Sequence, residues 1–264
     1  MSNPFPVEKA SSLSLLNKVA LVTGGSRGLG AGIARELAKR GANILITYNS
    51  AKGEAEKVAQ AIEEYGRQCI FMQGRSSDRD APKRIIESGV QKWGKIDIIV
   101  NNAGAGDDCF LADLTHELWD NIYDANIRMP TFLVQAAMPY LGPAPRIVNI
   151  SSVAARNGSA QMSAYASSKA ALEGITRVWA SELGQTHNAT VNCVNPGPIA
   201  TDMWLRDTDP EVLKFWDEKM KETPAAPRIA TVDDVAQIVA FLAEEGSRWC
   251  TGSVVNANGG LVPV

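Results

Sequence analysis

The sequence is poor in the residues that build metal sites and disulfide frameworks. Its 264 residues include only two histidines, His116 and His187, and four cysteines. The cysteines lie far apart, and no two of them form a Cys-x-x-Cys pair: Cys69, Cys109, Cys193 and Cys250. A zinc centre or a histidine-based catalytic triad requires more partners than these. We therefore expect no metal, and we expect free thiols in a reducing compartment.

Excess positive charge and long apolar runs are also lacking. The formal net charge is −3, and the lysines and arginines are scattered along the chain. No positive field is therefore available to hold a nucleic acid. No segment approaches the ~18 apolar residues of a membrane helix. Residues 1–17 contain Pro4 and Pro6 but no basic start followed by an apolar run, as a signal peptide would have. These features predict a cytoplasmic protein that binds neither nucleic acid nor membranes.

From residue 18 onwards, short apolar runs typical of buried strands alternate with segments of helical periodicity. The expected strands are residues 18–23, 43–48, 68–73, 96–101, 146–150, 190–195 and 253–256. The expected helices are residues 28–40, 52–65, 81–93, 116–141, 163–183 and 232–244. This alternation predicts an α/β fold: one Rossmann-type domain at 18–264, with a seven-stranded parallel sheet between two helical layers. Residues 1–17 are expected to form a flexible lead-in, and residues 142–145 a turn.

The stretch between residues 196 and 231 departs from this alternation. It contains no expected strand, includes Pro224 and Pro227, and carries an amphipathic segment at 210–221. A long insertion after the C-terminal end of a strand lies where open α/β sheets bind ligands. We expect a mobile substrate lid at about 198–228, the alternative being a surface excursion. Its apolar side chains either favour an apolar, ring-shaped substrate or serve in packing: Met203, Trp204, Leu205, Phe215, Trp216 and Met220.

A glycine-rich turn joins the first expected strand to the first expected helix. After Thr23, the glycines are spaced Gly-x-x-x-Gly-x-Gly from Gly24 to Gly30. Glycines at such a turn let the backbone approach a pyrophosphate, and a helix N-terminus offers free N–H groups and positive potential. Contacts with a dinucleotide are expected from these residues of the turn: Gly24, Ser26, Arg27, Gly28, Leu29 and Gly30.

The end of the second expected strand bears on the choice of cofactor. In a dinucleotide-binding fold, a carboxylate near this point takes the ribose 2′-hydroxyl of NAD. The sequence here is Thr47-Tyr48-Asn49-Ser50, without a carboxylate. Asn49 and Ser50 can donate hydrogen bonds to a 2′-phosphate, and Arg27 can supply positive charge. We therefore expect NADP(H) as the cofactor, with contacts from Tyr48, Asn49 and Ser50.

A tyrosine and a lysine are spaced by one helical turn, at Tyr165 and Lys169. Positions i and i+4 share a helix face, so the phenol and the ammonium are expected to face the same space. A nearby cation stabilises a phenolate, and a tyrosine so placed can exchange a proton near neutral pH. The pattern alone is weak evidence for catalysis, because a tyrosine and a lysine at this spacing are usually a solvent-exposed pair.

The position of this pair relative to the strands strengthens the interpretation. Polar or turn-forming segments follow three expected strands, at residues 101–104, 151–152 and 195–201. The carboxyl ends of parallel strands meet at one edge of a sheet. The three segments are therefore expected to converge with Tyr165 on the crevice in which a nicotinamide would lie.

Taken together, these motifs resemble those of the short-chain dehydrogenase/reductase family, from about Lys18 to Gly260. They are most similar to those of NADPH-dependent ketone reductases, such as fungal hydroxynaphthalene reductases and 3-oxoacyl reductases. The resemblance implies that Ser152 hydrogen-bonds the substrate oxygen and that Tyr165 is the general acid in reduction. It implies that Lys169 activates Tyr165 and that Asn126 supports a proton-relay water that reaches Lys169.

The resemblance also implies further cofactor contacts. Lys169 holds the nicotinamide ribose beside Tyr165, and Thr201 and the backbone of Ile199 bind the carboxamide. The remaining expected contacts lie at the same strand ends: Asn102, Ala103, Gly104, Pro196 and Gly197.

Two positions depart from the family pattern. Arg75 stands where family members carry an aspartate that bonds adenine. It is expected either to contact the adenosine end of the cofactor, with Ser76, or to point to solvent; Asp78 could replace the aspartate only if the loop shifted. Asn258 replaces the aspartate of the usual Asp-Gly-Gly, which has little consequence.

Two acidic residues, Asp107 and Asp108, follow the Asn-Asn-Ala-Gly turn. Either they reach the rim of the pocket and favour a cationic or hydroxylated ligand, or they form a solvated acidic loop.

The sequence thus predicts an NADPH-dependent oxidoreductase that reduces a ketone to a secondary alcohol, with Tyr165 as general acid. The substrate is expected to be apolar, aromatic or polyketide-like, which suits secondary metabolism. The alternatives are an alcohol dehydrogenase working oxidatively, a reductase with an added non-redox activity, and a cofactor-binding regulator. By resemblance, the chain is expected to form a homo-oligomer, either a tetramer or a dimer.

Overall fold

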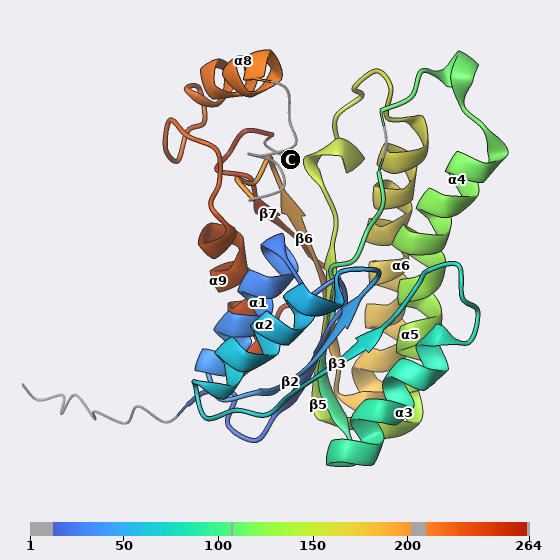
Figure 1. Cartoon of the computed structure of the whole chain (residues 1–264), viewed down its shortest axis with the longest axis vertical. Helices are drawn as coiled ribbons and strands as arrows, with labels where there is room; N and C mark the ends of the chain where they lie inside the picture. Colours follow the sequence, from blue (N-terminus) through green and yellow to red (C-terminus); the bar gives the residue numbers. More distant parts are fainter. Residues whose placement is uncertain (1–12, 107, 202–209, 263–264) are drawn as a thin grey trace, which may run out of the picture.

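A computed structural model describes residues 13–106, 108–201 and 210–262 of the chain. It contains a seven-stranded parallel sheet with the strand order β3-β2-β1-β4-β5-β6-β7 (Figure 1). The strands are β1 (Val19–Val22), β2 (Asn43–Tyr48), β3 (Cys69–Gln73), β4 (Ile96–Asn101), β5 (Leu141–Ile150), β6 (Thr190–Pro196) and β7 (Val254–Ala257). The strand order reverses between β1 and β4, so a ligand crevice is expected at the carboxyl ends of these two strands.

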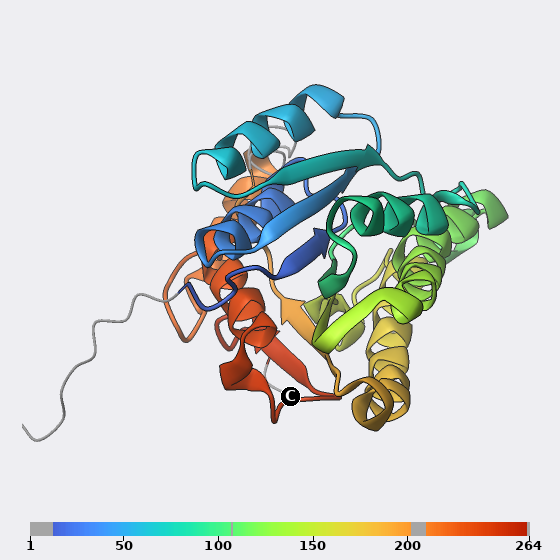
Figure 2. The ribbon, with the colours of Figure 1, turned by 90° about the horizontal axis from the view of Figure 1, so that it is seen from below.

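Helices cover both faces of the sheet (Figures 1 and 2). One layer consists of α1 (Gly28–Lys39), α2 (Lys52–Glu63) and α9 (Val232–Ala243). The other consists of α3 (Ala81–Trp93), α4 (His116–Tyr123), α5 (Met129–Ala137) and α6 (Ser163–His187). This arrangement confirms the expected fold class. None of the described helices has the length and apolar composition needed to cross a bilayer.

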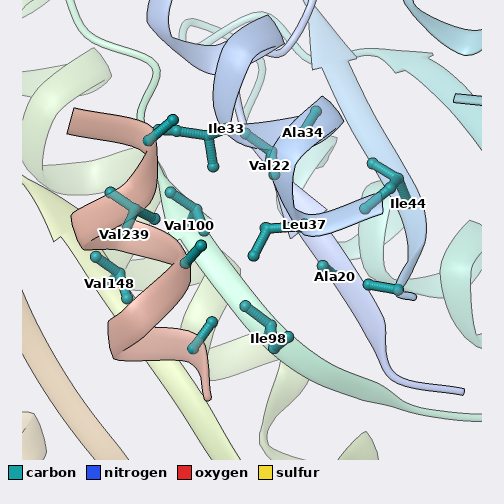
Figure 3. Close-up of a cluster of buried hydrophobic side chains, with 14 of the residues drawn as sticks. Ala20, Val22, Ile33, Ala34, Leu37, Ile44, Ile98, Val100, Val148 and Val239 are labelled. Carbon is teal, nitrogen blue, oxygen red and sulfur yellow. The ribbon is translucent and has the colours of Figure 1, made fainter. Parts of the chain in front are cut away.

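The alternation of side chains along β1 shows how the sheet joins the two layers. Ala20 and Val22 belong to the hydrophobic cluster under α1 and α9 (Figure 3), whereas Val19 and Leu21 belong to the cluster on the opposite face. Successive side chains of a strand point to opposite faces, so a strand covered on both sides must be apolar throughout. All four residues of β1 are accordingly buried.

The structure corrects the sequence prediction between residues 116 and 150. The single helix expected at 116–141 is divided into α4, a π-helical turn η2 (Asp124–Arg128), α5 and a short 3₁₀ turn η3 (Met138–Tyr140). The turn expected at 142–145 is wrong, because these residues lie within β5.

The pairing of β5 with β4 explains the second error. Leu141 pairs with Ile96 and Arg146 with Ile98, so the register shifts across the intervening residues. Glycine and proline favour turns in isolation, but here they form an irregularity within a strand. Gly142 is required at this point because a Cβ atom would lie 2.2 Å from the buried carboxylate of Asp97.

The segment after β6 carries the helix α8 (Pro210–Met220), which agrees with the amphipathic segment expected there. In the described parts of residues 197–231, an isolated bridge between Ile199 and Ala230 is the only β-pairing. Residues 1–12 and 202–209 lie outside the described residues, and with them most of the expected lead-in and Met203, Trp204 and Leu205 of the expected lid. Leu15, just inside the described part, is buried.

Candidate active site

The turn between β1 and α1 is packed so closely that glycine is needed at two points. Gly24 has a φ of +64°, in the left-handed region. At Gly30, a Cβ atom would lie 2.3 Å from the carbonyl oxygen of Gly24. The turn therefore has no side chains at Gly24 and Gly30, and its backbone is left uncovered at these two points.

The end of β4 is tied to this turn by hydrogen bonds. The Oγ1 of Thr23 accepts from the backbone N–H groups of Asn102 and Ala103, both at 3.0 Å. In return, the Nδ2 of Asn102 donates to the carbonyl of Thr23 at 2.9 Å. The Asn-Asn-Ala-Gly motif thus positions the glycine turn, and Thr23 takes part in the link although the sequence analysis did not single it out.

Helix α1 begins at Gly28 with no side-chain cap and no acidic residue in its first turn. The first N–H groups of a helix have no partner within the helix, and they carry the positive end of its dipole. The start of α1 is therefore suited to bind an anion such as a phosphate.

A cavity of about 510 Å³ runs along this turn, and we call it the glycine-loop cavity. Most of the expected cofactor contacts line it: Gly24, Ser26, Arg27, Gly28, Leu29, Gly30, Tyr48, Asn49, Ser50, Asn102, Ala103, Gly104 and Thr201. It is also lined by residues that the sequence analysis did not name as contacts: Thr47, Ala51, Glu54 and Gly74. The glycine turn, the end of β2, the Asn-Asn-Ala-Gly turn and Thr201 therefore meet at one cavity, whereas residues 151–152 and Tyr165 are not part of its lining.

Glu54 places a carboxylate on this cavity. Lys57 donates a hydrogen bond to it at 2.8 Å. This hydrogen bond lowers the pKa of Glu54, and the pair neutralises its own charge at the surface. Arg27 is the other charged residue that lines the cavity. Glu54 follows Ser50 by one helical turn, a spacing that could have revealed it.

Other expected contacts lie away from the cavity. Arg75 is exposed, and the carbonyl of Ser76 accepts a hydrogen bond from Arg128. Asp78 is paired with Arg84 at 2.5 Å, and this hydrogen bond lowers the pKa of its carboxyl. Asp78 is therefore held by Arg84 of α3 rather than free to replace the missing aspartate.

The loop after β6 also lies outside the glycine-loop cavity, except at Thr201. Pro196 is paired with Ala257 at the end of β6. Gly197 lines a separate cavity of about 330 Å³ beneath the segment that follows α8. Thr201 nevertheless lies close to the glycine turn, because a Cβ atom on Gly28 would be 3.4 Å from its methyl carbon.

Tyr165 and Lys169 share one face of α6, as the spacing predicts. The Nζ of Lys169 lies 5.7 Å from the centre of the Tyr165 ring. The ammonium is buried and donates a hydrogen bond to the carbonyl of Ile150, at the end of β5, at 2.8 Å. This contact fixes the lysine beside the tyrosine at the edge of the sheet.

Asn126 lies in the π-helical turn η2, and its side chain points into the protein. Its Oδ1 accepts from the N–H of Ala105, and its Nδ2 donates to the carbonyl of Ala105 and to Ser168, all at 2.9 Å. A Cβ atom on Gly104 would lie 3.0 Å from this Oδ1 and 3.4 Å from the Nζ of Lys169. Asn126 and Lys169 therefore approach the same point beside Gly104. Turns of π-helix occur often at functional sites.

The two serines after β5 have different environments. Ser151 is buried, and its hydroxyl donates to Glu173 at 3.0 Å. Ser152 is half-buried, and its Oγ accepts from the N–H of Ala154 at 3.2 Å. Only Ser152 has a hydroxyl that is not committed to the interior, so the structure distinguishes the serine that the family pattern selects.

A further cavity, of about 300 Å³, borders Tyr165, and we call it the tyrosine cavity. It is lined by Gly106, Asp108, Met162 and Tyr165. Gly106 packs against the ring, since a Cβ atom there would be 2.9 Å from Cδ2 of Tyr165. Asp108 is thus at the cavity, whereas Asp107 lies outside the described residues.

Within residues 13–106, 108–201 and 210–262, no three His, Cys, Asp or Glu side chains are grouped so that they could hold a metal. Burial raises the pKa of Cys69 and of Cys193 to about 12, so these thiols are not nucleophiles.

Comparison with known proteins places the chain in a class. A family model described as enoyl-(acyl carrier protein) reductase matches residues 24–262. A curated protein named short-chain dehydrogenase/reductase FrzI, from Cladobotryum sp, is 64% identical over 253 residues, which are 95% of this chain and 98% of the relative. The chain belongs to the short-chain dehydrogenase/reductase family of oxidoreductases.

Other relatives are similar over nearly their whole length. A hydroxynaphthalene reductase-like protein, Arp2 from Metarhizium anisopliae, is 36% identical over 94% of this chain and 96% of its own. A short-chain dehydrogenase from Burkholderia cenocepacia, solved in complex with NADP, is 38% identical with a TM-score of 0.87, covering 94% of this chain and 99% of its own. A blue fluorescent protein from a metagenomic library, solved with NADPH, is 37% identical with a TM-score of 0.86, covering 95% of this chain and 100% of its own.

Proposed function

We propose that this oxidoreductase uses NADPH to reduce a ketone to a secondary alcohol, with Tyr165 as the general acid. The observation that carries the proposal is the placement of Tyr165 and Lys169. They lie beside a strand end that also bears Ser152, on the sheet edge that holds the glycine-loop cavity. Lys169 lies next to Gly104, which lines that cavity, so a proton donor would stand beside a bound dinucleotide, as hydride transfer requires.

The residues of the glycine-loop cavity fit NADPH. The bare backbone at Gly24 and Gly30 and the uncapped start of α1 suit a pyrophosphate. Arg27, Asn49 and Ser50 line the same cavity and supply donors for a 2′-phosphate. The two related structures solved with NADP and NADPH support this choice.

The nicotinamide end would lie between Thr201 and Tyr165. Thr201 and the backbone of Ile199 would hold the carboxamide, while Lys169 would hold the ribose hydroxyls. Pro196 and Gly197 act by shaping the loop that carries Thr201. Arg75 and Ser76 lie on the loop after β3, where they would border the adenosine end.

Bound NADPH would supply the hydride, so the protein has to orient the carbonyl and deliver a proton. As negative charge develops on the carbonyl oxygen, Ser152 and Tyr165 donate hydrogen bonds to it; each such donor is worth about 3–4 kcal/mol. Tyr165 then gives its proton to this oxygen, and the ammonium of Lys169 stabilises the phenolate that remains. Asn126, beside Lys169, holds the loop at Ala105 and supports the path by which the proton is replaced.

The substrate that we propose is an aromatic or polyketide-like ketone that carries hydroxyl groups. The tyrosine cavity offers Met162 for contact with a ring and the carboxylate of Asp108 as an acceptor for a hydroxyl. The similarity to hydroxynaphthalene reductase-like proteins supports an aromatic substrate and a role in secondary metabolism. The segment that contains α8 would close over this substrate as a lid.

We expect the enzyme to act as a cytoplasmic homo-oligomer, a dimer or a tetramer. The outer faces of α4, α5 and α6 expose large apolar side chains that a second subunit could cover: Trp119, Phe132 and Val178.

The test is NADPH consumption, followed by its absorbance, against hydroxylated aromatic ketones, aliphatic ketones and 3-oxoacyl thioesters. We expect turnover of the first class, with Tyr165→Phe reducing kcat by about 10²-fold or more. Tyr65→Phe, which removes an exposed phenol at the end of α2, is the matched control and should leave kcat unchanged. If Tyr165→Phe keeps activity within a few-fold of the parent, the proposed role of Tyr165 is wrong.

A further inference from the structure

A buried carboxylate lies behind the candidate catalytic residues. Glu173 is on α6, one turn beyond Lys169, and its side chain is 4% exposed. Burying a carboxylate is costly unless charged and polar donors compensate it. None of the roles proposed above uses this residue, so the presence of a carboxylate at this place needs a reason.

The carboxylate of Glu173 joins four segments around the site. Its Oε1 accepts hydrogen bonds from the hydroxyl of Ser151 at 3.0 Å and from the Nδ2 of Asn195 at 3.2 Å. Its Oε2 accepts from the Nε of Arg156 at 2.6 Å. These partners lie directly after β5, on β6 and on the loop that follows Ser152, while Glu173 itself is on the helix of Tyr165.

The contacts enclose Ser152 from both sides along the chain. Ser151 precedes it directly, and Arg156 follows the short 3₁₀ turn η4 (Val153–Ala155) that Ser152 begins. Within the described residues, the hydroxyl of Ser152 has a single hydrogen bond, the local one that it accepts from the N–H of Ala154. The place of its hydroxyl relative to Tyr165 therefore depends on how the residues on either side are anchored to α6.

We propose that Glu173 is a positioning residue: it holds Ser152 at the distance from Tyr165 that lets both hydroxyls donate to one carbonyl oxygen. This inference rests on the proposed function. Its link to Asn195, directly before Pro196, also ties the loop that leads to Thr201 to the same carboxylate. The carboxylate of Glu173 thus links the helix that carries Tyr165, the segment that carries Ser152 and the loop that leads to Thr201.

The primary test compares Glu173→Gln with the parent and with Glu182→Gln, which changes an exposed glutamate on the same helix. Misplacement by about 1 Å of a group that acts in the transition state lowers kcat by about 10- to 100-fold. We expect Glu173→Gln to lower kcat to this extent and to change the KM of the ketone by less than about twofold. Glu182→Gln should match the parent. An unchanged kcat in Glu173→Gln would overturn the inference.

A double-variant cycle separates positioning from a general structural role. If Glu173 acts through Ser152, then in a Ser152→Ala background Glu173→Gln should lower kcat by no more than about twofold further. A structural role would reduce activity to the same extent in both backgrounds, and that result would also overturn the inference. Absence of NADPH-dependent turnover in the parent would instead refute the proposed function, and this inference with it.

Glu173→Gln could fail to fold, which a thermal melt would reveal. Arg156→Gln then tests the same link from the loop, because the Arg156 side chain is 33% exposed and its loss leaves Ser151 and Asn195 to satisfy the carboxylate. Arg156→Lys should restore part of the activity lost in Arg156→Gln. If both Arg156 variants have the kcat of the parent, the carboxylate does not position Ser152.

Discussion

Gly30 gives a direct test of the dinucleotide site. In Gly30→Ala, the new methyl carbon would lie 2.3 Å from the carbonyl oxygen of Gly24 and 2.5 Å from the Nδ2 of Asn102. Comfortable non-bonded contacts begin near 3.5 Å, so one side has to move by about 1 Å. Neither neighbour can move freely, because the carbonyl of Gly24 is part of the backbone and the side chain of Asn102 is hydrogen-bonded to Thr23. The glycine turn itself must therefore shift.

The size of the effect follows from this overlap. Forcing an extra carbon into a packed site costs about 1–3 kcal/mol, which lowers the Tm of a chain of this size by roughly 2–10 °C. A turn displaced by about 1 Å no longer presents its N–H groups to a phosphate. We therefore expect the Kd for NADPH, measured by fluorescence titration, to rise at least about tenfold, equivalent to 1.4 kcal/mol.

Two other glycines serve as matched controls. In Gly32→Ala, on the same helix, the methyl would lie 2.1 Å from Val232 of α9, away from the turn. It should lower Tm and leave the Kd for NADPH unchanged. In Gly53→Ala, on α2, the methyl meets nothing within 4 Å, and the better helix propensity should raise stability by about 0.5–1 kcal/mol. A parental Kd in Gly30→Ala, or an equal loss of affinity in Gly32→Ala, would refute the reasoning.

Three further predictions concern charged residues. Arg27→Ala should raise the KM for NADPH by about tenfold or more and change that for NADH little, because Arg27 supplies the positive charge on the glycine-loop cavity; equal effects on both cofactors would contradict this. Asp108→Asn should raise the KM of hydroxylated ketones while sparing their unsubstituted counterparts, and kinetics with matched pairs of substrates will show whether it does. The guanidinium of Arg228, which donates to Asp234 at 2.7 Å, holds the pKa of that carboxyl well below its ordinary value. Because this pKa is lowered in the folded state, the ionised carboxylate stabilises the fold at pH values above the ordinary carboxyl pKa of about 4. This stabilisation is lost as the pH falls below that value toward the lowered pKa. Thermal melts between pH 7 and roughly pH 3 should therefore show a steeper loss of Tm in the parent than in Asp234→Asn, and parallel curves would contradict the assignment.

Much of the fold was predictable because its signals are local. The apolar runs of β1 and β4 are buried along their whole length, and such runs identify central strands of a parallel sheet. The glycine turn was predictable for the same reason, since its spacing and its place before a helix are both visible in the sequence.

The errors arose where distant residues decide the local structure. Gly142 and the two prolines that follow it favour a turn, yet pairing with β4 and the carboxylate of Asp97 keep this segment in a strand. The π-helical turn at Asn126 has no sequence signature, because it is set by the hydrogen bonds of Asn126 to Ala105 and Ser168. Glu173 lies four residues after Lys169, and this spacing alone could have indicated a charged residue on the buried face of the helix.

The proposed role of Tyr165 depends most on where a bound nucleotide lies relative to its hydroxyl. The measurement that tests this most directly is a crystal structure of the protein with NADPH. We predict the pyrophosphate at the start of α1 and the nicotinamide ring between Thr201 and the hydroxyl of Tyr165. A nicotinamide bound far from that hydroxyl, or a nucleotide bound outside the glycine-loop cavity, would contradict the account.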